Sequence, residues 1–235
     1  MKQEERTYGC LIIHGFAGSP DEVEPLHTCL RQQGYITECP ILMGHEDNLR
    51  NLGASTHLQW IQSAEEALLQ LQKRCTHIIL LGFSMGGHIA ANLAMKYPVA
   101  AVVTMNTPIY YWNIKRVVSN TFHDVRSGDH RHLKHYRDSA FKTPLKAMIE
   151  FRRILNKTKP LYDELTCPML IAQGLRDDTT QLRSAAYIHT HIRSDVKQLK
   201  YYPASEHLIC LGPDKERLFE DICAFVKEVK SVDLK

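Results

Sequence analysis

The sequence predicts an α/β protein, with a mostly parallel sheet covered by helices on both faces. Apolar runs of strand length alternate with helix-like segments along most of the chain. The residues with catalytic potential follow directly after predicted strands, where a parallel sheet collects its functional groups. A chain of 235 residues with 44% hydrophobic content can bury a complete core in one domain and still carry an insertion.

The first segments establish this alternation. Residues 8–13 form an apolar run that ends in a glycine-containing loop. Residues 21–34 are predicted to be a helix, because Gly34 supplies the usual C-terminal stop, and residues 35–39 the next strand. Residues 40–54 are expected to be a loop.

The middle of the chain carries the strongest helix and strand signals. Residues 55–73 have helical spacing, with an apolar face made of Ile61, Ala64, Leu68 and Leu71. The apolar run 78–81 indicates a buried strand, and residues 88–96, rich in Ala, Leu and Met, indicate a helix.

In the second half, the alternation lapses and then returns. Strands are expected at residues 99–105, 167–173 and 197–202, and helices at 144–154, 184–192 and 217–230. The lapse predicts an insertion at 109–161, within a core formed by residues 1–108 and 162–235.

The pattern G-x-S-x-G occurs at residues 82–86, between the predicted strand 78–81 and the predicted helix 88–96. This strand-turn-helix setting is typical of a nucleophile elbow, in which a strained turn holds a serine hydroxyl clear of the sheet. Gly82, Gly86 and Gly87 allow the helix to pass close to the strand because they lack Cβ atoms. Ser84 is therefore the predicted nucleophile.

An acid and a histidine follow in the chain order of α/β-hydrolases. Asp177, just after the strand 167–173, is the predicted acid, with its neighbour Asp178 as the rival. His207 is the predicted base, because downstream of the acid only this histidine follows a strand, whereas His189 and His191 lie within a helix. The backbone amides of Phe16 and Met85 are expected to form the oxyanion hole.

Two other groups of residues are open to more than one interpretation. Tyr110 and Trp112, with Tyr111 between them, either line an acyl pocket or form the core of the insertion, and Gly15 allows substrate to approach the backbone. The histidines 130, 132 and 135 lack the acidic or thiolate partners and the spacing of a metal site, so a solvated basic face is favoured and no metal or cofactor is expected.

Composition argues against several other classes of protein. A net charge of +3, with no long basic block, does not suggest nucleic acid as a partner. The chain has no apolar signal segment and no membrane-spanning run, so we expect a cytoplasmic protein without stable membrane insertion. Seven scattered cysteines, without a C-x-x-C pair, are expected to be reduced.

The chain resembles the small bacterial carboxylesterases of the α/β-hydrolase superfamily, of which the bacterial monoacylglycerol lipases are close relatives. The motifs that carry the resemblance are residues 14–18, 44–45, 82–87, 104–108, 143–146, 173–177, 205–207 and 221–225. The resemblance implies a small helical cap at 109–161 and a triad at Ser84, Asp177 and His207. Glu206 replaces the glycine that the family often has before its histidine, and would raise the pKa of His207 if the two side chains are close.

The motifs and the resemblance together imply a serine hydrolase that cleaves carboxylic esters with short to medium acyl chains or monoacylglycerols, through an acyl-enzyme and without a cofactor. The same triad would serve thioesters, amides or lactones. A small-ligand receptor that keeps the fold but performs no chemistry is the alternative outside enzymes. The sequence gives no indication of oligomeric state.

Overall fold

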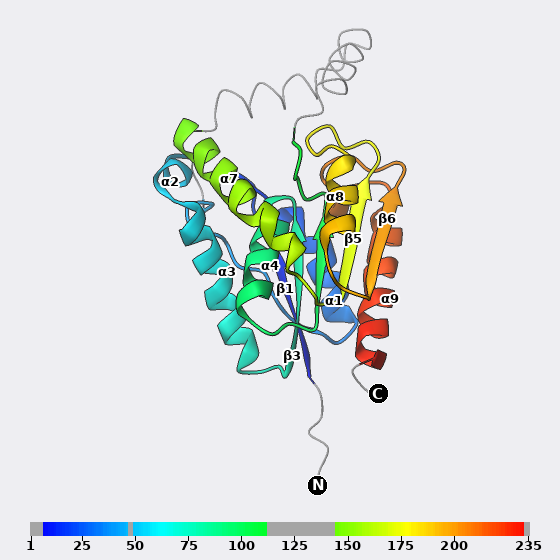
Figure 1. Cartoon of the computed structure of the whole chain (residues 1–235). Helices are drawn as coiled ribbons and strands as arrows, with labels where there is room; N and C mark the ends of the chain where they lie inside the picture. Colours follow the sequence, from blue (N-terminus) through cyan, green and yellow to red (C-terminus); the bar gives the residue numbers. More distant parts are fainter. Residues whose placement is uncertain (1–6, 47–48, 112–143, 233–235) are drawn as a thin grey trace.

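A computed structural model describes residues 7–46, 49–111 and 144–232 (Figure 1). Its centre is a six-stranded sheet in which every neighbouring pair is parallel, in the order β2-β1-β3-β4-β5-β6. The strands are β1 (Tyr8–Ile13), β2 (Ile36–Glu38), β3 (His77–Phe83), β4 (Ala101–Met105), β5 (Met169–Gly174) and β6 (Lys197–Tyr202). The predicted parallel α/β fold is confirmed.

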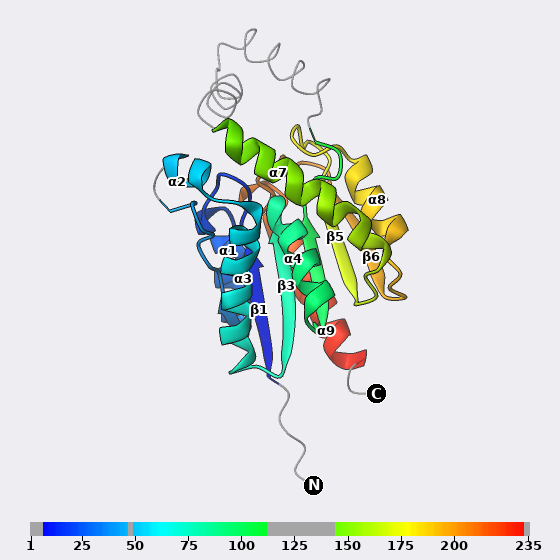
Figure 2. The ribbon, with the colours of Figure 1, turned by 60° about the vertical axis from the view of Figure 1, so that its left-hand side comes forward.

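Helices connect the strands and cover both faces of the sheet (Figure 2). The α-helices are α1 (Glu24–Gln32), α2 (Leu49–Ala54), α3 (His57–Gln72), α4 (Met85–Lys96), α7 (Leu145–Thr158), α8 (Arg183–His191) and α9 (Lys215–Val232). Short 3-10 helices lie at η1 (Pro20–Glu22), η2 (Lys159–Asp163) and η3 (Ile209–Leu211). Within the described ranges, no helix has both the length and the apolar character needed to cross a bilayer.

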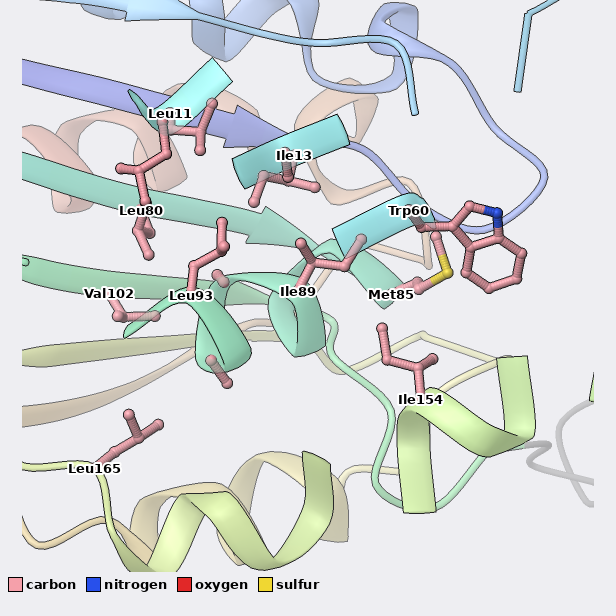
Figure 3. Packing of buried hydrophobic residues seen from close by; sticks show 14 of the residues in the cluster. Leu11, Ile13, Trp60, Leu80, Met85, Ile89, Leu93, Val102, Ile154 and Leu165 are labelled. Atoms are coloured by element: carbon pink, nitrogen blue, oxygen red, sulfur yellow. The ribbon is translucent and has the colours of Figure 1, made fainter. Parts of the chain in front are cut away.

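The strand residues alternate between two apolar cores. Leu11 and Ile13 of β1 pack into the core with α3, α4, α7 and α8, whereas Cys10 and Ile12 pack into the core with α1 and α9. Figure 3 shows Leu80 and Val102 of the sheet near Ile89 and Leu93 of α4. A fully buried aliphatic side chain stabilises a fold by about 1.5–3 kcal/mol, so these two layers hold the strand ends in place.

Helix α3 begins at a capping box that the sequence contains. The Thr56 side chain accepts from the Gln59 amide, and the Gln59 side chain accepts from the Thr56 amide at 2.9 Å. The buried Glu150 of α7 accepts from the backbone amide of His57 at 3.2 Å and contacts its ring nitrogen Nδ1. Helix α7 is thereby joined to the first turn of α3, close to the elbow helix α4.

Most predicted boundaries shift by a few residues, and the predicted helix 21–34 is divided into η1 and α1. Two other differences have a physical reason. Residues 40–54 were expected to be a loop, but residues Leu49–Ala54 form α2, whose Gly53 lies against Pro144 at the start of α7. Such a short helix has little signal of its own, because its partner is far away in the sequence. Helix α4 begins at Met85, three residues before the predicted start at residue 88. The sequence did not indicate this first turn because Gly86 and Gly87 are poor helix formers.

The predicted cap, 109–161, includes residues 112–143, which lie outside the described residues. Of this segment, the structure describes residues 109–111, α7 and most of η2. The helix predicted at 144–154 is present and extends to Thr158. The boundaries of the cap stay a prediction.

Candidate active site

The turn between β3 and α4 has the geometry of a nucleophile elbow. Ser84 has φ 51° and ψ −118°, a backbone conformation that costs a non-glycine residue free energy and persists only where its surroundings enforce it. Its amide donates to the Met105 carbonyl at 2.8 Å, and its carbonyl accepts from the Gly87 amide at 3.1 Å. The strand neighbour β4 and the first turn of α4 therefore hold Ser84 in this strained turn.

Glycines permit the close packing around this turn. A Cβ atom on Gly86 would lie 2.2 Å from the Ile13 carbonyl oxygen, and one on Gly82 would lie 2.3 Å from the backbone of Gly86. Both distances are far below van der Waals contact, so any side chain at these positions would push α4 away from β1 and β3. The predicted role of these glycines in close helix-strand packing is confirmed.

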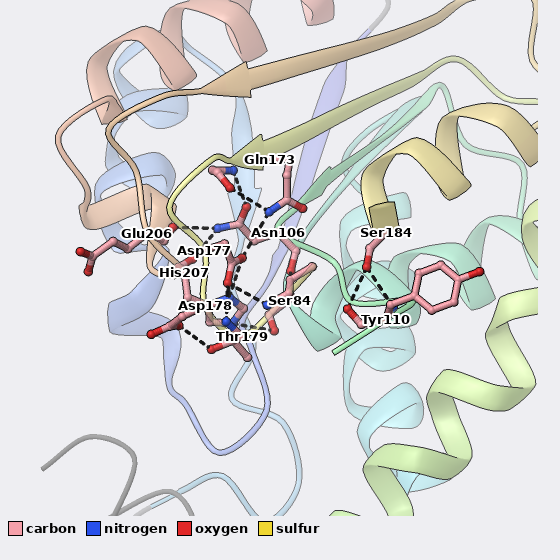
Figure 4. A network of polar contacts seen from close by, with 12 residues as sticks. Ser84, Asn106, Tyr110, Gln173, Asp177, Asp178, Thr179, Ser184, Glu206 and His207 are labelled. Carbon is pink, nitrogen blue, oxygen red and sulfur yellow. Dashed lines mark hydrogen bonds and ion pairs between the residues drawn. The ribbon is translucent and has the colours of Figure 1, made fainter. Parts of the chain in front are cut away.

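Three side chains from separate parts of the chain meet beside this turn (Figure 4). The Nε2 atom of His207 lies 3.1 Å from Ser84 Oγ. On the other side of the same ring, Nδ1 lies 3.0 and 3.1 Å from the two carboxylate oxygens of Asp177. The histidine can therefore accept a proton from the serine while it donates its other N–H to the carboxylate.

Asp177 is buried and held by backbone amides. Its Oδ1 atom accepts from the amides of Thr179 and Thr180, both at 2.8 Å. The carboxylate of its neighbour, Asp178, instead accepts from the Thr179 hydroxyl at 3.1 Å. Of the two acids that the sequence offered, Asp177 is the one that the structure brings to His207.

The electrostatic surroundings favour the charged form of His207. Burial alone would lower the pKa of His207, but the charge and hydrogen bond of Asp177 oppose it, with smaller contributions from Glu22 and Asp178, so the pKa is raised above its ordinary value. The Glu206 side chain, which the sequence suggested as a source of such a shift, is exposed and points away from the ring in Figure 4.

Asn106, which was not among the predicted site residues, joins the loops that carry the base and the acid. Its Nδ2 donates to the carbonyls of Glu206 and His207 at 2.9 and 2.7 Å, and its Oδ1 accepts from the Gly174 amide at 2.7 Å. Its φ of 49° is a left-handed conformation that asparagine tolerates better than most residues. The sequence did contain one sign of this role, since Asn106 is a polar residue directly after β4, the buried strand that pairs with β3.

The loop after β1 packs against the elbow. His14 is buried; its Nε2 accepts from the Leu42 amide at 3.2 Å, and its Nδ1 bonds to the Gly15 carbonyl at 2.9 Å. Burial lowers the pKa of His14 to about 4, so the ring is neutral and braces the loop. Because α4 begins at Met85, the Met85 amide is among the helix amides without an intrahelical acceptor, as an oxyanion donor must be.

Aromatic side chains surround Phe16 of this loop. The Phe16 ring stacks on Phe151 of α7 at 5.0 Å and lies 5.7 Å from Trp60 of α3, measured between ring centroids. The Tyr111 ring also contacts the Phe151 ring, edge-on, at 6.0 Å between centroids. The aromatic cluster of Phe16, Trp60, Tyr111 and Phe151 therefore joins the loop that carries the predicted oxyanion amide to α3 and α7.

The predicted substrate-binding residues fall in different places. Gly15 lies in the loop beside the elbow, and its amide donates to Glu22 at 2.9 Å. The Tyr110 ring lies 4.0 Å from the Arg183 guanidinium and 4.9 Å from Lys159 Nζ, and in Figure 4 it points away from Ser84. Trp112 lies outside the described residues, as do the histidines 130, 132 and 135. Among the described residues, no group of three or more histidine, cysteine or acidic side chains could hold a metal ion.

Comparisons with known proteins identify the family of the chain. Residues 5–214 match the model of a family described as serine aminopeptidase, S33. The thermostable monoacylglycerol lipase of Bacillus sp. (strain H-257) is 27% identical over 228 residues, which cover 92% of this chain and 89% of that protein. The carboxylesterase of Bacillus subtilis (strain 168) is 22% identical over 227 residues, 93% of this chain and 92% of that protein.

Solved structures show the same fold. One, from work on the metagenome-derived lipolytic enzymes LipS and LipT, has a TM-score of 0.80 at 24% identity and covers 95% of this chain and 94% of that chain. A soluble variant of the monoglyceride lipase of Saccharomyces cerevisiae has a TM-score of 0.74 at 18% identity, covering 97% and 88%. The resemblance to small bacterial esterases and lipases that the motifs suggested is confirmed, and the chain belongs to the serine aminopeptidase S33 family, with the α/β-hydrolase fold.

Proposed function

We propose that this protein is a serine esterase that hydrolyses carboxylic esters through an acyl-enzyme on Ser84. The observation that carries the proposal is the contact of His207 with Ser84 Oγ at 3.1 Å on one side and with Asp177 at 3.0 Å on the other. A relative named carboxylesterase and another named monoacylglycerol lipase support an ester as the substrate.

In the proposed reaction, His207 Nε2 takes the proton of Ser84 as its Oγ attacks the ester carbonyl. The amides of Met85 and Phe16 stabilise the negative charge that develops on the carbonyl oxygen. The imidazolium then gives its proton to the departing alcohol, which leaves the acyl group on Ser84. A water molecule, deprotonated by His207, attacks this acyl group and releases the carboxylic acid.

The proposed substrates are esters with short to medium acyl chains, or monoacylglycerols. Phe16, whose amide is the proposed oxyanion donor, is only partly buried and packs against the buried Trp60 and Phe151, so its ring offers apolar surface that favours the alkyl part of a substrate over polar groups. The similarity to a monoacylglycerol lipase supports this assignment. Tyr110 and Trp112 as pocket residues stay predictions.

A substrate panel tests the proposal. We expect turnover of p-nitrophenyl esters to peak at short to medium acyl chains, and a monoacylglycerol to be hydrolysed, because the apolar surface binds the acyl group. A thioester and an anilide with the same acyl group show whether the enzyme prefers another bond. Faster cleavage of the anilide, or a preference for acetyl esters of bulky polar alcohols, would contradict the proposed substrate class.

The pH dependence follows from the raised pKa of His207. The base works only when it is neutral, so kcat/KM should be full above this pKa and fall as the pH decreases through it. An unperturbed histidine titrates at about 6.5, so we expect the midpoint of the acid limb, the part of the pH profile where kcat/KM falls with decreasing pH, to lie above that value. The measurement is kcat/KM for an ester without ionising groups, across neutral and acidic pH. A plateau that continues unchanged to about pH 5 would contradict the role of His207 as base.

A further inference from the structure

Glu22 lies inside the loop that carries the proposed oxyanion amide. Its Oε2 atom accepts from the Gly15 amide at 2.9 Å. The loop closes so tightly around this carboxylate that a Cβ atom on Gly18 would lie 2.2 Å from it. Ala17, between these two glycines, has a positive φ of 56°. The carboxylate of Glu22 is thus the side chain around which the turn from Gly15 to Gly18 is folded.

The loop that holds this carboxylate packs against Phe83, whose ring neighbours the base of the proposed triad. A Cβ atom on Gly15 would lie 3.1 Å from Glu22 Oε2 and equally 3.1 Å from the Phe83 ring, and the Phe83 ring is 5.1 Å from the His207 ring, centroid to centroid. Glu22, Asp177 and Asp178 are the acidic groups that raise the pKa of His207 against the effect of burial. The pKa of Glu22 is itself raised, chiefly by burial, while the Gly15 amide and His207 oppose the shift and Asp21 adds to it.

We infer that Glu22 is a positioning residue of the active site, with two separable roles. Its hydrogen bond to Gly15 fixes the loop that presents the Phe16 amide, and its negative charge stabilises the positive charge that His207 acquires during the reaction. The inference rests on the proposed function, since both roles concern Ser84 acylation. It adds a second carboxylate, contributed by the loop after β1, to the acid that follows β5.

The two roles have different consequences. A negative charge that favours the imidazolium lowers the barrier of the step in which His207 takes a proton. The same charge raises the pKa of His207, so the base becomes protonated and inactive at a higher pH. A displaced oxyanion donor reduces transition-state stabilisation without changing the titration of His207. Substitutions that remove one property and keep the other can therefore distinguish them.

The experiment compares Glu22→Gln and Glu22→Asp. Glutamine keeps an oxygen acceptor for the Gly15 amide but removes the charge. The acid limb of kcat/KM should therefore move to lower pH by about half a unit. Plateau kcat should fall about threefold, which is the factor that corresponds to half a pKa unit. Aspartate keeps the charge but is one methylene shorter. It should leave the acid limb in place and lower kcat about tenfold, with little change in KM.

Glu24→Gln is the matched control. Glu24 is exposed and bonded to His27 and Thr28 on α1, so this substitution removes the same charge two positions away from Glu22 without disturbing the oxyanion loop. Thermal unfolding of each variant checks that it is folded. If Glu22→Asp does not fold, the pH profile of Glu22→Gln decides.

The inference is overturned if Glu22→Gln has the same pH profile as Glu24→Gln, or if folded Glu22→Asp keeps wild-type kcat. Labelling of the wild-type protein with a fluorophosphonate separates this failure from that of the proposed function. A wild-type protein that is labelled on Ser84 and hydrolyses esters supports the proposed function whatever the Glu22 variants do. If the wild-type protein is neither labelled nor active, the proposed function fails and the Glu22 inference falls with it.

Discussion

Replacing Ser84 with alanine should lower kcat for a p-nitrophenyl ester by about 10⁵-fold or more, which corresponds to a loss of roughly 7 kcal/mol of transition-state stabilisation. The reason is that no other group in the proposed mechanism can accept the acyl chain, and the remaining triad members act only through the serine oxygen. Steady-state hydrolysis, with the substrate's spontaneous rate subtracted, measures the effect.

The fold should survive this substitution. Removing one oxygen leaves the backbone bonds of Ser84 to Met105 and Gly87 intact, and thermal unfolding can verify this. Ser231→Ala, the same substitution on the exposed side of α9, is the control and should retain full activity. Turnover by Ser84→Ala within tenfold of wild type would refute the assignment of the nucleophile.

Replacing Asp177 with asparagine should lower kcat about 10⁴-fold while the geometry of the site is kept. An amide can donate to Nδ1 of His207, which would place the proton of the imidazole on Nε2, where the mechanism needs a lone pair to accept the proton of Ser84. The loss should appear in kcat with little change in KM, because Asp177 is buried behind His207 and does not face substrate.

Asp178→Asn provides the comparison on the adjacent residue. Asp178 is also buried, and its carboxylate accepts from the Thr179 hydroxyl, which an amide oxygen can do equally well. Since Asp178 contributes less than Asp177 to the pKa of His207, its variant should keep activity within a few-fold of wild type and shift the acid limb slightly to lower pH. Equal losses in both variants would refute the choice of Asp177 as the acid.

The nucleophile elbow was predictable because its requirements are local. A buried strand, a G-x-S-x-G turn and a helix are adjacent in the chain, and the glycines at 82 and 86 are required by contacts under 2.5 Å that any side chain would create. The parallel sheet was predictable for a related reason, since each strand and helix carries its own periodicity. These features needed no knowledge of distant contacts.

Asn106 and Glu22 could not be recognised in the same way, because their roles depend on partners far away in the sequence. Asn106 bonds to carbonyls about a hundred residues further along the chain, and Glu22 affects a histidine in a different loop. In the sequence, one is a polar residue after a strand and the other an acid near a helix start, both common. Their importance follows only from the strand order, which places the ends of β1, β3, β4 and β5 side by side.

The pocket residues show the limit of composition as a guide. For the aromatic run at 110–112, the sequence left a substrate pocket and the core of the insertion as alternatives, and the Tyr110 ring lies against the cations Arg183 and Lys159. Phe151 of α7, which was not among the predicted substrate-binding residues, contacts Phe16. Aromatic residues serve packing and binding equally well, so only the fold decides which of them lie near the catalytic groups.

Ser84 should become covalently modified by an active-site reagent because His207 activates it. The most direct measurement is peptide mapping by mass spectrometry after reaction with a fluorophosphonate, whose adduct does not hydrolyse readily. We predict one phosphonyl group per chain, on the peptide that contains Ser84, with no labelling of Ser84→Ala and much slower labelling of His207→Ala. A label on another residue, or an unlabelled protein that still hydrolyses esters, would contradict the role of Ser84 as a nucleophile activated by His207.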